Sequence, residues 1–271
     1  MSAVEPAILS IDHVGVRFGG LVAIADLHFD VKPGEIVSLI GPNGAGKTTA
    51  FNVMTGFLRP SQGEVRFRGT SLKGLQPYQI VRLGLSRTFQ RTSVFPDDTV
   101  FDNVMIGLHR QGRSRLIDTL LGRDRAHEAQ LRERAGELLD WVGLSGRAQD
   151  KAGSLAYGEQ RLVGVALALA TEPAMLLLDE PVSGMNASET QVFVRLIRSI
   201  RNRGVTLLLV EHDMPMVMEV SDRIVVLNYG RLIAEGPPAA IRADPAVIEA
   251  YLGQGSAARE AAQAVRETSD A

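Results

Sequence analysis

The run GPNGAGKTT at residues 41–49 has the residue types and spacing of a phosphate-binding loop, between an apolar stretch and a helix-compatible one. In the pattern GxxxxGK[ST] the glycines let successive backbone N–H groups turn inward around phosphates. Lys47 is expected to reach the terminal phosphates, and the Thr48 hydroxyl to ligate Mg²⁺. The residues predicted to bind the nucleotide, ATP or GTP, are Gly41, Asn43, Gly44, Ala45, Gly46, Lys47, Thr48 and Thr49.

Two adjacent carboxylates, Asp179 and Glu180, end the apolar run of MLLLDEP at 175–181. Because successive side chains of a strand point to opposite sides, the two carboxylates are expected to have different surroundings. Asp179 would hold Mg²⁺ through water, and Glu180 would act as general base on an attacking water. A pair of helix-capping carboxylates is the alternative. A phosphate-loop kinase would need a place for an acceptor hydroxyl instead, and it is disfavoured because it leaves LAYGEQ at 155–160 and EHDM at 211–214 unexplained.

The turn LAYGEQ at 155–160 stands directly before an Ala- and Leu-rich segment, RLVGVALALA. Gly158 is either a loop residue ahead of a helix or a point where backbone approaches a phosphate. In the second case the helix expected from Glu159 would direct its positive N-terminal dipole at that phosphate. These residues alone leave both possibilities open.

The elements that must position these residues alternate between strands and helices. Strand-like runs are AILSIDHV, AIADLHFDV, EIVSLI, GEVRFRG, MLLLD and VTLLLV, and IVVLNYGRLIAEG reads as a hairpin. Apolar strands that alternate with helices, such as the one expected near 189–201, indicate a parallel sheet buried on both faces. From about 108 to 149 the sequence is charged and helix-forming, which predicts a helical insert.

The composition of the chain limits which classes of protein it can belong to. The 271 residues are 45% hydrophobic with a net charge of −2, so a sizeable core is expected and no electrostatic argument favours nucleic acid as a partner. Cysteine is absent, which excludes disulfides and thiolate metal sites. No run of about 18 apolar residues occurs, so a role at a membrane is expected to act through a partner.

Taken in order, these motifs and RTFQ at 87–90, SGMN at 183–186 and EHDM at 211–214 resemble the nucleotide-binding subunit of ABC transporters, to about residue 252. The resemblance implies an α/β P-loop NTPase fold with a mainly parallel RecA-like core sheet and an N-terminal antiparallel β subdomain. A helical subdomain of about 91–158 would be inserted in one ABC ATPase domain at 1–253. A polar tail would follow at 254–271.

The resemblance also implies roles for individual residues, with ATP and Mg²⁺ as cofactors. Gln90 would sense Mg²⁺ and the attacking water, and His212 would be a switch histidine near the terminal phosphate. Phe18 would stack on adenine, a core phenylalanine being the alternative. The signature stretch, which acts on ATP held by a second chain, would comprise Leu155, Ala156, Tyr157, Gly158, Glu159 and Gln160. The D-loop residues would be Ser183, Gly184 and Asn186, and the metal ligands Thr48, Gln90 and Asp179.

Three residues depart from the commonest family form: Ala156 replaces a serine, Tyr157 a glycine and Asn186 an aspartate. LAYG and an asparagine at this D-loop position also recur in the importer ATPases for branched-chain amino acids and for related amides or urea. The sequence therefore resembles these importer ATPases more closely than the family at large. The resemblance therefore implies the ATP-hydrolysing subunit of an ABC importer, for branched-chain amino acids. An exporter ATPase, for example for lipids, and a non-transport ABC ATPase acting on DNA or ribosomes are the alternatives.

The implied partners are a second ABC ATPase chain, identical or different, integral membrane permease subunits and a solute-binding protein, without nucleic acid. The chain would lie peripherally on the cytoplasmic face of the inner membrane. The loop after Gln90 contains apolar Val94, Phe95 and Phe101 among polar residues, a composition that suits a groove for a short permease helix.

Overall fold

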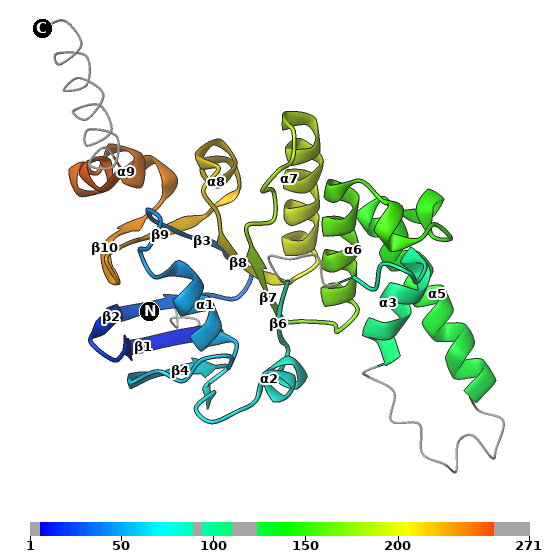
Figure 1. The fold of residues 1–271 in the computed structure, drawn as a ribbon, viewed down its shortest axis with the longest axis horizontal. Coiled ribbons are helices and arrows are strands. Elements are labelled where there is room, and N and C mark those ends of the chain that lie inside the picture. The colour runs from blue at the N-terminus through cyan, green and yellow to red at the C-terminus, as the bar shows by residue number, and fades with distance from the viewer. Residues whose placement is uncertain (1–5, 89–93, 110–123, 252–271) are drawn as a thin grey trace, which may run out of the picture.

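The computed structural model describes residues 6–88, 94–109 and 124–251 (Figure 1). The strands are β1 (Leu9–Phe18), β2 (Leu21–Val31), β3 (Ile36–Ile40), β4 (Gln62–Phe67), β5 (Thr70–Ser71), β6 (Leu85–Arg87), β7 (Met175–Asp179), β8 (Thr206–Val210), β9 (Arg223–Asn228) and β10 (Arg231–Gly236). The α-helices are α1 (Lys47–Met54), α2 (Pro77–Leu83), α3 (Val100–His109), α5 (Asp124–Val142), α6 (Tyr157–Leu169), α7 (Ala187–Asn202), α8 (Met214–Val220) and α9 (Pro238–Ala243). Short 3-10 helices are η1 (Ser145–Arg147) and η2 (Ala152–Ser154).

The described strands form one mixed sheet in the order β5-β4-β1-β2-β10-β9-β3-β8-β7-β6. Strands β9, β3, β8, β7 and β6 are parallel, as the alternation of strands and helices predicted. Strands β1, β2, β4 and β5 pair antiparallel, and β9 and β10 form the predicted hairpin. The two regions meet where β2 pairs parallel with β10, at Asp26 and Arg231. The predicted core sheet and N-terminal β subdomain are therefore one continuous sheet.

The parallel part of the sheet is covered on both faces, which explains why its central strands β7 and β8 are almost entirely apolar. All five residues of β7 are buried. Met175 and Leu177 belong to the core that includes α1, whereas Leu176 and Leu178 belong to the core that includes α6 and α7. Because neighbouring residues of a strand face opposite sides, only an uninterrupted apolar run fills both cores.

Helices α3, α5 and α6 pack against one another and lie at the opposite end of the molecule from β1, β2 and β4 (Figure 1). Val104 of α3, Leu138 of α5 and Val163 of α6 are buried in one cluster. Two of these helices lie within the range predicted for a helical insert. The limits of 91–158 for that subdomain stay a prediction, and the tail at 254–271 lies outside the described residues.

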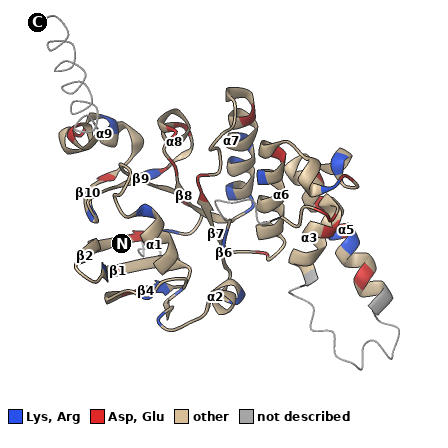
Figure 2. Cartoon of the chain, viewed as in Figure 1, with Lys and Arg blue, Asp and Glu red and all other residues tan. Residues whose placement is uncertain are grey.

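Acidic and basic residues are interspersed along the described elements (Figure 2). This pattern agrees with the small net charge of the whole sequence. Among the described helices, none combines the length and apolar character needed to cross a lipid bilayer.

Candidate active site

The loop between β3 and α1 depends on two glycines whose backbone leaves no room for a side chain. Gly41 has φ +152°, and a Cβ there would lie 2.1 Å from the Leu227 carbonyl oxygen. Gly46 has φ +104° and immediately precedes α1, where a Cβ would lie 2.7 Å from the Ala23 carbonyl oxygen. The loop is therefore fixed against β2 and β9, and its backbone amides at the start of α1 can meet an anion.

Lys47, the first residue of α1, folds back over this loop. Its Nζ donates to the carbonyl oxygens of Gly41 at 2.6 Å and Pro42 at 3.0 Å. Burial lowers the pKa of Lys47, and the negative charges of Glu180 and Asp179 act in the opposite direction. A partly desolvated ammonium held by two carbonyls gains from an added phosphate charge, which suits the role predicted for this lysine.

Asp179 ends β7 with its side chain only 1% exposed, and it is paired with an arginine. Arg87 of β6 donates through Nη2 to Asp179 Oδ2 at 2.6 Å, and through Nη1 to Asn52 Oδ1 at 2.8 Å. The Arg87 guanidinium also lies over the ring of Phe51, 5.5 Å from its centroid. Asn52 and Phe51 belong to α1, so Arg87 ties the predicted metal ligand to the helix that follows the phosphate loop.

The residues at this position fit Mg²⁺. The second carboxylate oxygen of Asp179, Oδ1, is buried and has no hydrogen-bond partner among the described residues. The Thr48 side chain at the start of α1 is exposed. A carboxylate and a hydroxyl are hard oxygen donors, which Mg²⁺ prefers. Gln90, the third predicted ligand, lies outside the described residues.

Glu180 is the first residue after β7 and has φ +47°, a left-handed conformation that is uncommon for a side chain of this size. Its backbone N–H donates to the Val210 carbonyl oxygen at 2.8 Å, and its side chain is half-buried, unlike that of Asp179. The strand alternation used to separate the two carboxylates therefore ends at Asp179, and the left-handed turn sets the direction of Glu180. Backbone strain of this kind costs about 1–3 kcal/mol and is concentrated at functional sites.

His212 follows β8 with its side chain 61% exposed, beside a buried glutamate that the sequence reasoning missed. Glu211 Oε1 accepts from the Val182 N–H at 2.9 Å, and Oε2 accepts from the His212 N–H at 2.9 Å and the Asp213 N–H at 3.4 Å. Burial raises the pKa of Glu211 although these N–H groups lower it. Glu211 thereby joins the loop that carries Glu180 to the loop that carries His212.

We predict that Glu211→Gln lowers the free energy of unfolding by about 1–3 kcal/mol, because the amide nitrogen would face a buried backbone N–H and leave it unpaired. The change should appear as a lower urea midpoint with an unchanged slope. Glu137→Gln on the exposed surface of α5 is the control, since its ion pair with Arg134 is solvent-exposed and contributes little. Equal midpoints for the two variants would contradict the structural role of Glu211.

The signature stretch forms the first turn of α6, which begins at Tyr157 and not at the predicted Glu159. Gly158 is therefore a helical residue, and it is absent from the glycines with positive φ in the described chain. The Ala156 N–H donates to Glu159 Oε2 at 3.0 Å, so this donor is already used within the chain. Leu155 is buried, while Ala156 and Tyr157 are exposed. The solvent-exposed part of this turn therefore consists of Ala156 and Tyr157, which precede Gly158.

The D-loop lies beside the signature stretch of the same chain. Gly184 has φ +82°, and a Cβ there would lie 3.4 Å from the Tyr157 ring. Asn186 caps α7, with Oδ1 accepting from the N–H groups of Ser188 at 2.9 Å and Glu189 at 3.0 Å. Asparagine at this position therefore retains the acceptor that a helix cap requires. The Ser183 N–H donates to the Glu180 carbonyl oxygen at 3.3 Å.

Phe18 ends β1 with 50% of its surface exposed, so the core alternative for this residue is wrong. Leu21 and Val22, across the turn, are also exposed, at 66% and 39%. An exposed aromatic ring beside other apolar side chains suits stacking on a planar base. The adenine contact itself stays a prediction.

An apolar cavity of about 440 Å³ lies between α2, β6 and α6, and its rim includes Phe57 and Tyr78, each about half exposed. Arg87 and Gln160 also line it, so it reaches both the Asp179 pair and the signature helix. Val94, Phe95 and Phe101, the described apolar residues of the loop after Gln90, are not among its lining: Val94 and Phe101 pack on the helical core, and Phe95 is exposed. The expectation that Val94, Phe95 and Phe101 suit a groove for a permease helix does not refer to this cavity and stays a prediction.

A family model described as "ABC transporter" matches residues 24–183, and one described as "Branched-chain amino acid ATP-binding cassette transporter" matches residues 231–257. The chain is 44% identical over 250 residues to the high-affinity branched-chain amino acid transport ATP-binding protein LivG of Escherichia coli (strain K12), covering 91% of this chain and 98% of LivG.

Solved structures show the same relationship. The crystal structure of the ADP conformation of an ATP-binding cassette of an ABC transporter has a TM-score of 0.81 and 31% identity, covering 92% of this chain and 99% of that one. A dimeric cassette in a post-hydrolysis state, bound to ADP and Pi, has a TM-score of 0.73 and 25% identity, covering 85% and 98%. The chain belongs to the ABC transporter family and is one of its ATP-binding, ATP-hydrolysing subunits.

Proposed function

We propose that this chain hydrolyses ATP with Mg²⁺ to drive the import of branched-chain amino acids through a membrane permease. The observation that carries the substrate class is the 44% identity to LivG across nearly the whole chain, together with the separate C-terminal match at 231–257. The same match disfavours the exporter and non-transport alternatives.

In the proposed reaction the loop amides at the start of α1 and the Lys47 ammonium hold the terminal phosphates. Asp179 and Thr48 would hold Mg²⁺, which when bound neutralises phosphate charge. Glu180 accepts the proton of the attacking water, and His212 contacts the terminal phosphate from the end of β8. Phe18 stacks on the adenine. Gln90 would couple movement of the permease to the position of the catalytic water.

The site needs a second ATPase chain, identical or different. In Figure 1 the phosphate loop at α1 and the signature turn at the start of α6 belong to separate parts of the molecule. Tyr157 and Gly158 would face the ATP held by the partner chain, with the α6 dipole directed at its phosphate. The dimeric cassette among the similar structures supports this arrangement.

The remaining partners are permease subunits and a solute-binding protein, with the chain peripheral on the cytoplasmic face of the inner membrane. The apolar cavity between α2, β6 and α6 would receive a short permease helix, since exposed Phe57 and Tyr78 stand at its rim. Arg87 lines this cavity and donates a hydrogen bond to Asp179, so a change in the shape of the cavity would be transmitted through Arg87 to the metal site.

Deleting the chain in its host should abolish high-affinity uptake of labelled leucine, isoleucine and valine, because no other step of the transporter supplies the energy. Uptake of urea and of an unrelated solute should be measured in the same cells. Restoring the wild-type chain should restore uptake, whereas Glu180→Gln should not. Normal uptake of the three amino acids in the deletion strain, with loss of urea uptake or misplacement of an envelope lipid, would refute the proposed substrate.

A further inference from the structure

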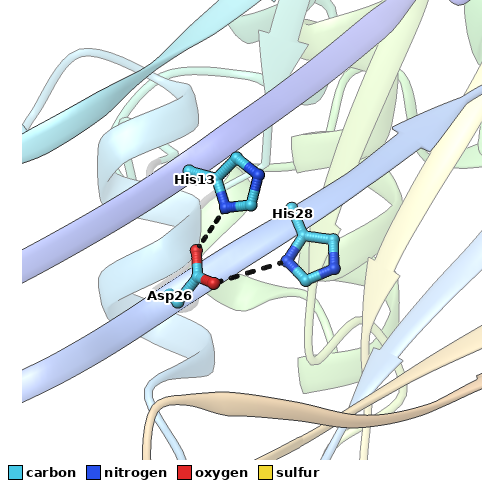
Figure 3. A group of neighbouring side chains, drawn as sticks. All are labelled: His13, Asp26 and His28. Carbon is cyan, nitrogen blue, oxygen red and sulfur yellow. Dashed lines mark hydrogen bonds and ion pairs between the residues drawn. The ribbon is translucent and has the colours of Figure 1, made fainter.

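Three side chains of the antiparallel region, His13 of β1 and Asp26 and His28 of β2, lie close together, and both imidazoles face the Asp26 carboxylate (Figure 3). His13 Nδ1 lies 2.9 Å from Asp26 Oδ1, and His28 Nδ1 lies 3.8 Å from Asp26 Oδ2. The two imidazole rings stack with their centroids 5.0 Å apart. None of the three residues belongs to the nucleotide site described above.

The local fold explains why the three side chains meet. Asp26 and His28 are two residues apart on β2 and therefore point to the same face of the sheet. The pairing of β1 with β2 shifts register between Ile11 and Val14, and His13 within this shift has φ +46°. A bulge of this kind re-aims one side chain of the strand. It brings His13 onto the face that carries Asp26 and His28.

The donor set and its spacing suit a transition-metal ion. Two imidazole nitrogens and one carboxylate oxygen favour Zn²⁺ and its neighbours Co²⁺, Ni²⁺ and Cu²⁺, in contrast to the oxygen donors around Asp179. Bond lengths of about 2.0–2.1 Å place tetrahedral ligands about 3.3 Å from one another. His13 Nδ1 lies 2.9 Å from Asp26 Oδ1 and His28 Nδ1 lies 3.8 Å from Asp26 Oδ2, and the possible ligand atoms of the three residues all lie within 4.8 Å of one another, so small side-chain rotations bring them to this spacing.

The three side chains are accessible to a metal ion from solvent, and the strands that carry them are held in the sheet. The side chains of His13, Asp26 and His28 are 66%, 44% and 56% exposed, so an ion could enter from solvent and water could fill its remaining coordination position. The ligands stand on two paired strands, and the Ala25 N–H beside Asp26 donates to the Gly230 carbonyl oxygen at 2.8 Å. The cluster is therefore attached to the strand that joins the antiparallel region to the rest of the sheet.

We propose that His13, Asp26 and His28 form a binding site for one Zn²⁺ or chemically similar divalent transition-metal ion. The bound ion links β1 to β2 and stabilises this end of the sheet, because an unfolded chain does not hold the three ligands together.

The test uses the full-length chain without a histidine tag, stripped of metal and free of nucleotide. Calorimetric titration with Zn²⁺ should give one ion per chain, and Co²⁺ should produce ligand-field absorption bands. At a free Zn²⁺ concentration of 100 times Kd, the thermal midpoint should rise by about 5–10 °C. Absence of binding, or several weak ions without a distinct first one, would overturn the proposal.

Single variants separate this site from adventitious binding. His28→Ala, Asp26→Asn and His13→Asn should each weaken Zn²⁺ binding at least about tenfold, asparagine being chosen at 13 because it tolerates positive φ. His127→Ala, which removes an exposed histidine of α5, should bind as the wild type does. All four variants should keep the ATPase activity measured without Zn²⁺, which reports an intact fold. Equal Zn²⁺ affinity in His28→Ala and His127→Ala would refute the site.

Discussion

Glu180→Gln is expected to lower ATP turnover by the purified chain about 100- to 10,000-fold while ATP still binds, because a positioned general base contributes a factor of this size. The amide keeps the size of the side chain and cannot accept a proton from water. Lys47 and the phosphate loop, which hold the phosphates, are unchanged by the substitution. Steady-state phosphate release and equilibrium binding of ATP measure the two effects separately.

The matched control is Glu172→Gln, because Glu172 also has a left-handed backbone, at φ +50°, and its side chain is 59% exposed. This variant should turn over ATP at nearly the wild-type rate. With hydrolysis blocked, Glu180→Gln should also accumulate an ATP-bound dimer that light scattering detects. Turnover within about twofold of the wild type in Glu180→Gln would remove Glu180 from the catalytic role.

Phe57→Asp should leave ATP hydrolysis by the isolated chain nearly unchanged and reduce amino-acid uptake through the assembled transporter at least about tenfold. Phe57 is 52% exposed at the rim of the apolar cavity, so a charge there is tolerated by the fold. A side chain that acts as a hot spot of an interface contributes at least about 2 kcal/mol, which corresponds to about 30-fold in affinity. Uptake assays in a deletion strain, with phosphate release by the purified variant, measure both activities.

Phe95→Asp is the comparison for this experiment, since Phe95 is exposed to the same degree, 51%, and does not line the cavity. Uptake should stay near normal in this variant. The opposite pattern, with uptake lost in Phe95→Asp and kept in Phe57→Asp, would move the docking surface to the loop after Gln90. Equal loss of hydrolysis and uptake in Phe57→Asp would place Phe57 in the catalytic unit.

Features with a local physical cause were predictable from the sequence. The glycines of 41–46 predict a loop whose backbone requires glycine. Gly41 and Gly46 indeed have positive φ and no space for a Cβ. The all-apolar run before Asp179 requires burial on both faces, and the structure places it inside a parallel sheet covered on both sides. The family resemblance could also be recognised from the sequence, because it rests on short motifs that occur in a fixed order.

What the tertiary structure alone decided depends on residues distant in sequence. Arg87 reaches Asp179 across 92 positions and Glu211 reaches Val182 across 29, pairings that no periodicity encodes. The sequence position of Phe18 fits either base stacking or the core, and only its exposure in the fold distinguishes the two. The apolar cavity is lined jointly by α2, β6 and α6, and the His13 cluster requires both a bulge and a strand register. The sequence thus determines the chemistry that each motif offers, whereas packing over long separations determines which groups meet, because side-chain contacts across the sheet depend on register and not on local residue type.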